Sequence, residues 1–78
     1  MPYFFVDTSD GDRFIRDDIG LEVESLQAVR DQAMATLPAM SQRRMLDGDH
    51  REVFAIIRDS AGHVLCKAKL TIWCEWSD

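Results

Sequence analysis

The stretch from His63 to Trp76 restricts the fold most, because small or apolar side chains occupy every second position in it. The positions that we expect to face the core are Val64, Cys66, Ala68, Leu70, Ile72, Cys74 and Trp76. The intervening positions are mostly polar or charged, so the stretch predicts one long β-strand with a buried face and a wet face. Residues 51–58 predict a strand that forms a hairpin with it through a turn at residues 59–62.

The first seventeen residues have a second hairpin pattern. Residues 2–8 are rich in aromatic and β-branched side chains and predict a strand, and residues 13–17 predict its return partner. Between them Asp10 precedes Gly11, a pair that favours the positive φ angles of tight hairpin turns.

A helix is expected between the two hairpins. Ser25 is placed to cap it, since a serine hydroxyl accepts a hydrogen bond from a backbone N–H of the first turn. Apolar residues then recur at intervals of three and four, as on one face of a helix, at Leu26, Val29, Ala33, Leu37 and Met40. Pro38 falls inside this stripe, so we expect the helix to be kinked or broken there. Arg43 and Arg44 suit a helix C-terminus, and Gly48 suits its end.

These segments predict an α+β fold with the order β-β-α-β-β, in a single domain over residues 1–78. The sheet is expected to be four-stranded and mostly antiparallel, with the one helix on one face. A four-residue loop at 59–62 also sets a register for the second hairpin. The expected cross-strand partners are Arg58 with His63, Ile56 with Leu65, Phe54 with Lys67, and Glu52 with Lys69.

The net charge of −5 is concentrated at the N-terminus, where residues 1–24 carry seven acids against two arginines. An acidic chain repels phosphate at long range, which disfavours nonspecific binding of nucleic acid. No apolar run approaches bilayer length and no signal peptide is recognisable, so we expect a cytoplasmic protein without a membrane partner. Cys66 and Cys74 would lie about 26 Å apart on one strand, beyond disulfide reach, and we expect both to be buried thiols in a reducing compartment.

Catalytic and metal sites are not indicated. The acids Asp7, Asp10, Asp12, Asp17 and Asp18 do not have the spacing of a calcium loop, and we expect them to belong to a solvated hairpin turn. His50 and His63 stand beside turns, without a serine or cysteine at the spacing of a catalytic dyad. We therefore expect a non-enzymatic protein that uses no cofactor.

The sheet face away from the helix is the best candidate for function, because no second helix is available to cover it. The predicted surface combines apolar and basic side chains, namely Phe54, Ile56, Arg58, Leu65, Lys67, Lys69 and Trp73. Exposed apolar patches on small proteins are often interfaces, so we expect the protein to act by association, either with itself as a homodimer or with another protein. Aromatic and basic residues on a sheet also occur in single-stranded nucleic-acid platforms, which leaves that class open as an alternative.

The sequence resembles a family of short bacterial proteins of unknown function. The resemblance rests on the opening M-P-Y-F-F-V-D, on I-R-D-D-x-G at residues 15–20, and on R-E-V at 51–53 followed by D-S-A-G at 59–62. It implies the same fold and no known activity. More distantly, residues 3–37 are similar to HicB-type antitoxins, in which an acidic hairpin leads into an alanine-rich helix. That similarity implies a regulator that binds a toxin, although this chain lacks the C-terminal DNA-binding module of that family.

Overall fold

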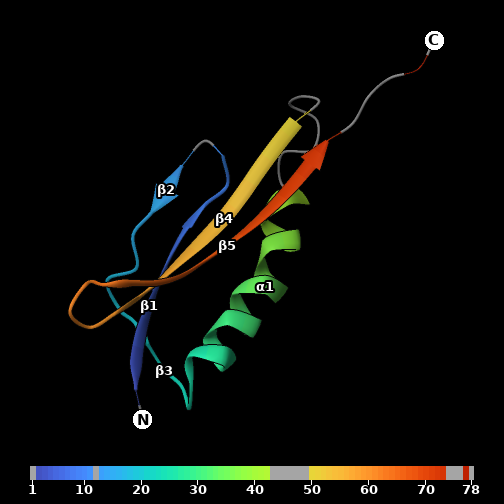
Figure 1. Ribbon diagram of the computed structural model, residues 1–78. Coiled ribbons are helices and arrows are strands. Elements are labelled where there is room, and N and C mark those ends of the chain that lie inside the picture. Colours follow the sequence, from blue (N-terminus) through green and yellow to red (C-terminus); the bar gives the residue numbers. More distant parts are fainter. Residues whose placement is uncertain (1, 12, 43–49, 74–76, 78) are drawn as a thin grey trace.

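The computed structural model describes residues 2–11, 13–42, 50–73 and 77. Within these ranges the elements are β1 (Tyr3–Ser9), β2 (Phe14–Ile15), β3 (Leu21–Glu22), α1 (Leu26–Gln42), β4 (His50–Asp59) and β5 (Val64–Trp73). The strands form one antiparallel sheet in the order β2-β1-β4-β5, and α1 packs on one face of it (Figure 1). The predicted α+β fold is confirmed, with the addition of β3, which pairs with β1 beside β2.

The helix begins as predicted. The Ser25 hydroxyl accepts a hydrogen bond from the backbone N–H of Ala28 at 3.1 Å. Of the predicted stripe, Val29, Ala33 and Leu37 are buried against the sheet, whereas Leu26 at the start is exposed. Pro38 lies inside α1, which continues through Gln42, so the proline does not divide the helix. Its ring is exposed to solvent, outside the buried stripe.

The core lies between α1 and the two long strands. The buried apolar residues are Phe4, Val29, Ala33, Leu37, Val53, Ala55, Ile57 and Ala68. Full burial of a side chain such as Val29 or Ile57 contributes about 1.5–3 kcal/mol, so these few residues supply much of the stability of a small chain. Cys66 is a free thiol that packs against this core, but it is half-buried where full burial was expected.

The register of the β4–β5 hairpin differs from the prediction by two residues. Phe54 lies opposite Lys69 and Ile56 opposite Lys67, because the loop is one residue shorter than expected and a bulge follows between Ile57 and Arg58. A displacement of two residues leaves every side chain beyond the bulge on its predicted face. On the turn side of the bulge the displacement is one residue, so side chains there lie on the opposite face from the one predicted. Val64 lies opposite Arg58 and is 64% exposed, so the prediction that Val64 faces the core is wrong.

Several predicted features lie outside the described residues. They are the helix end with Arg43, Arg44 and Gly48, and the last strand positions with Cys74 and Trp76.

Candidate interaction surface

The predicted surface residues lie on β4 and β5. Phe54, Ile56, Lys67 and Lys69 share the sheet face away from α1, as their pairing requires. Leu65 lies at the bulge and is 41% exposed, and Trp73 at the end of β5 is 69% exposed. Phe54 and Ile56 are only half-exposed, so the most accessible apolar side chains of this surface belong to β5.

Arg58 does not join this surface as a free base, and that part of the prediction is wrong. Its guanidinium is buried and donates two hydrogen bonds to the Asp7 carboxylate, from Nε to Oδ2 at 2.8 Å and from Nη2 to Oδ1 at 3.0 Å. The Phe5 ring lies against it, with its centroid 4.9 Å from Cζ. These hydrogen bonds lower the pKa of Asp7 and raise that of Arg58, so both groups stay charged.

Asp7 is correspondingly not part of a solvated turn. It is 5% exposed, and it lies on β1 within the face that Arg58 occupies on β4. The pair joins residues 51 positions apart in the sequence. Strand alternation alone does not reveal such a pair, because it places Asp7 on the wet face, where an acid needs no partner.

Asp17, in the loop between β2 and β3, binds this loop to the Asp7–Arg58 pair. Its backbone N–H donates to Asp7 Oδ1 at 2.9 Å, and its carbonyl oxygen accepts from Arg58 Nη2 at 2.8 Å. Its carboxylate accepts from three backbone N–H groups, those of Val6, Ile19 and Gly20, each at 3.0 Å. Burial by itself would raise the pKa of Asp17, but these three donors outweigh it and hold the pKa below its ordinary value.

Gly20 allows this loop to close. Its φ is +84°, and a Cβ at this position would overlap the Tyr3 ring and come within 2.9 Å of the Phe5 ring. The Tyr3 hydroxyl donates to the Ile19 carbonyl oxygen at 3.0 Å, so the ring is held against the loop. The D-x-x-G pattern at residues 17–20 is therefore structural: the aspartate binds the turning backbone and the glycine makes room for the rings.

The sheet thus has one closed edge and one open edge. We call the outer side of β1 the closed edge: β3 pairs with its first half, β2 pairs with its end, and the Asp17 carboxylate binds the Val6 N–H between them. We call the outer side of β5 the open edge, because β5 is the last strand of the described sheet. Its backbone is the longest stretch that no described strand pairs with on that side.

The two lysines of β5 are bound within the chain. Lys67 Nζ lies 4.8 Å from the centre of the Phe54 ring, and Lys69 Nζ lies 3.4 Å from Glu52 Oε2. The predicted contacts therefore form, although across diagonals of the observed register instead of directly. Because Glu52 and Phe54 are on β4, both lysine heads lean inward over the sheet and away from the open edge.

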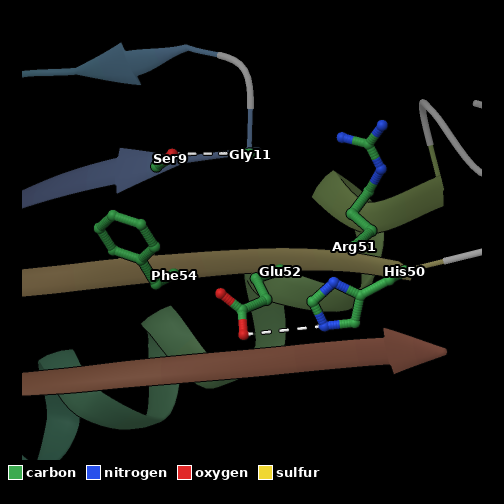
Figure 2. A pocket seen from close by; sticks show the side chains of 6 residues that line it. All are labelled: Ser9, Gly11, His50, Arg51, Glu52 and Phe54. Atoms are coloured by element: carbon green, nitrogen blue, oxygen red, sulfur yellow. Dashed lines mark hydrogen bonds and ion pairs between the residues drawn. The ribbon is translucent and has the colours of Figure 1, made fainter. Parts of the chain in front are cut away.

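A polar hollow of about 320 Å³ lies where β4 begins, next to the turn after β1 (Figure 2). It brings together Ser9, His50 and Glu52, three residue types that occur in catalytic sites. However, the Ser9 hydroxyl accepts from the Gly11 N–H at 3.2 Å, and His50 Nε2 is 3.9 Å from Glu52 Oε2, too far for a hydrogen bond. The same Glu52 oxygen lies nearer to Lys69, so the hollow does not assemble a base with its orienting acid.

Within the described residues no three His, Cys, Asp or Glu side chains are grouped so that they could hold a metal ion. The helix described, α1, does not meet the length and hydropathy that a membrane span requires.

Comparison with known proteins gives one match. No curated protein and no solved structure matches the chain. A family model described as a domain of unknown function matches residues 3–71, a range that includes the Asp7–Arg58 pair, both D-x-x-G loops and most of the open edge. The predicted resemblance to short proteins of unknown function is thereby confirmed, and the chain belongs to the DUF6894 family.

Proposed function

We propose that this domain is a non-enzymatic binding module that associates with a second copy of itself through the open edge. The observation that carries the proposal is that β5, a ten-residue strand, is the last strand of the described sheet. It also carries three exposed apolar side chains, Val64, Leu65 and Trp73. The N–H and C=O groups on an unpaired edge form a template for another strand.

Natural proteins often protect such an edge with lysines that project across it. Lys67 and Lys69 are in the right strand for this purpose, but their heads are bound to Phe54 and Glu52 of the neighbouring strand. They leave the edge backbone accessible while keeping the adjacent face soluble. This arrangement is what we expect of an edge that pairs with a specific strand, and not of an edge that is protected against pairing.

The nucleic-acid alternative has less support in the structure. Of the three bases that the sequence placed on the open face, Arg58 is neutralised by Asp7, Lys69 is paired with Glu52, and Lys67 covers the ring of Phe54. A stacking platform needs accessible aromatic faces beside uncommitted positive charge. Among the described residues of this face, the two rings that are more than half exposed, Trp73 on β5 and Phe14 on β2, lie at opposite ends of the sheet order.

The oligomeric state tests the proposal directly. Light scattering coupled to size-exclusion chromatography should give twice the mass of the chain, and a strict monomer at high micromolar concentration would contradict the proposal. Trp73→Asp places a charge on the open edge and should shift the protein toward monomer. Ile19→Asp is the matched control, since Ile19 is 82% exposed on the opposite side of the sheet order and its substitution should leave the dimer intact.

The fluorescence of Trp73 also tests the alternative function, nucleic-acid binding. Fluorescence titration with a single-stranded oligonucleotide at low salt should show no quenching if the open edge serves protein association. Saturable quenching that persists in a monomeric protein would instead support nucleic-acid binding.

A further inference from the structure

Symmetry limits how two copies of β5 can pair. A two-fold interface brings the same strand to both sides, so an antiparallel pair of β5 strands is centred on one residue that faces its own copy. Residues at equal distances from that centre then lie opposite each other, and their side chains point to the same face. The residues of β5 that share a face with Lys67 and Lys69 must therefore meet one another across the interface.

Charge excludes three of the possible centres. A pair centred on Lys67 or on Lys69 would place that lysine opposite its own copy. A pair centred on Ala68 would place Lys67 opposite the partner's Lys69, twice by symmetry. Like charges that lie directly opposite destabilise a strand pair, so the sequence of β5 itself disfavours these registers.

The remaining centres differ in how many residues of β5 pair with the partner strand. With Leu70 at the centre, residues 67–73 pair with their counterparts, whereas with Thr71 at the centre only residues 69–73 of the described strand do so. Each further step toward the end of the strand removes more backbone hydrogen bonds. Leu70 therefore gives the longest described overlap that is free of opposed lysines.

We propose that two chains join their open edges in an antiparallel β5–β5 pair centred on Leu70. The inference rests on the proposed function and specifies the register of that association. It places Lys67 opposite the partner's Trp73, where an ammonium and an indole ring attract each other, and Lys69 opposite the partner's Thr71. Lys67 already lies over Phe54 at 4.8 Å, so its head would be bordered by one ring from each chain.

The helix side of β5 fits the same register. Ala68, Leu70 and Ile72 alternate with the lysines, and in this register they form a continuous apolar strip, with Ala68 opposite the partner's Ile72. A hollow of about 540 Å³ lies between α1 and this part of β5 and is lined by Arg30, Asp31, Met34, Cys66, Lys67 and Ala68. Met34 is 53% exposed there, and an isoleucine from the partner strand would cover it.

Cysteine pairing distinguishes the registers, in a background where Cys66 and Cys74 are replaced by alanine. Directly opposite residues in an antiparallel pair have Cα atoms about 4.5–5.5 Å apart, within disulfide range. A centre at Leu70 predicts that Lys69→Cys and Thr71→Cys chains form a disulfide-linked dimer when mixed under oxidising conditions, and that neither does so alone.

The other outcomes overturn the inference in separate ways. Crosslinking of Lys69→Cys alone would place the centre at Lys69, and crosslinking of Thr71→Cys alone would place it at Thr71. A dimer by light scattering without any of these disulfides would reject the β5–β5 register while the proposed function stands. A monomer in the uncrosslinked background protein, with the wild type also monomeric, would reject the proposed function itself.

Discussion

The closed edge and the open edge of this sheet differ in burial and in what pairs with them: three of the seven residues of β1 are buried, against one of the ten residues of β5. Along β1 it adds two short strands and, between them, the carboxylate of Asp17 bound to the Val6 N–H. Along β5 it adds nothing within the described residues. The buried charged pair of the described residues, Asp7 with Arg58, lies on the β1 side of the sheet, where Arg58 also binds the loop that closes β1.

The difference shows what the N-terminal acids are for. An excess of acids near a hairpin turn has a simple explanation in solvation, and Asp18 fits it, since its contact with Arg16 is 3.6 Å long and exposed. Asp7 and Asp17 do not fit it, because each binds backbone or guanidinium groups that would otherwise be unpaired. These two acids therefore belong to the hydrogen-bond network of the closed edge and not to a solvated turn.

The largest expected effect comes from removing the charge pair that closes β1. Asp7→Ala leaves the Arg58 guanidinium buried without its carboxylate and removes the acceptor for the Asp17 N–H. We expect it to lower the free energy of unfolding by on the order of 3 kcal/mol, measured by urea denaturation. A chain of this length has a total stability of about 4–12 kcal/mol, so the loss is a quarter or more of the total.

Asp18→Ala is the control for this prediction. It removes a neighbouring acid that forms an exposed ion pair with Arg16, and we expect almost no change in stability. Equal midpoints for Asp7→Ala and Asp18→Ala would show that the closed edge does not depend on the buried pair.

A smaller effect separates the two D-x-x-G loops. Asp59 accepts from the N–H groups of Ala61 and His63, much as Asp17 does from Ile19 and Gly20, and Gly62 has a φ of +92°. Yet a Cβ at Gly62 would meet no atom within 4 Å, whereas one at Gly20 would overlap the Tyr3 ring. The second loop is an open hairpin and the first is packed.

Alanine at the two glycines measures this difference. Gly62→Ala should cost about 1 kcal/mol, the strain of the backbone alone. Gly20→Ala should cost at least about 2 kcal/mol, because the aromatic rings must also move. The comparison is read from denaturation midpoints of the two variants, and equal losses would mean that Tyr3 and Phe5 do not constrain the loop.

Local patterns in the sequence predict much of this fold. Ser25 caps the helix, Gly11 has the positive φ expected of its turn, and the alternation in β5 assigns Ala68 and Leu70 to the core side and Lys67 and Lys69 to the other. Each of these features depends on residues close together in the chain, where spacing and backbone propensity suffice.

The features that the sequence did not predict depend on distant residues. The Asp7–Arg58 pair joins β1 to β4 across 51 positions of the sequence, and the short strand β3 is defined by its pairing with β1. The hairpin register failed for a local reason, since the bulge between Ile57 and Arg58 has no glycine or proline to mark it. The predicted surface was consequently too wide: it included Arg58, whose buried guanidinium is bound to Asp7 of β1.

Acid should weaken the closed edge, because two of the carboxylates that hold it have lowered pKa values. The pKa values of Asp7 and Asp17 are lowered from 3.8 in the folded protein, so their contribution to stability is fully present above the unfolded value. It is lost as the pH falls through the lower folded values. The loss should be smaller than that of Asp7→Ala, because a protonated carboxyl group still accepts a hydrogen bond.

Asp7→Asn isolates this contribution. The variant should be less stable than the wild type at pH 7, and the difference should shrink as both are titrated below the ordinary aspartate pKa, because the wild type loses what the variant never had. Asp31→Asn, at an exposed position on α1, should run parallel to the wild type throughout. Urea midpoints measured from neutral to acidic pH give the comparison, and a constant difference between Asp7→Asn and wild type would show that the Asp7 charge does not hold the edge closed.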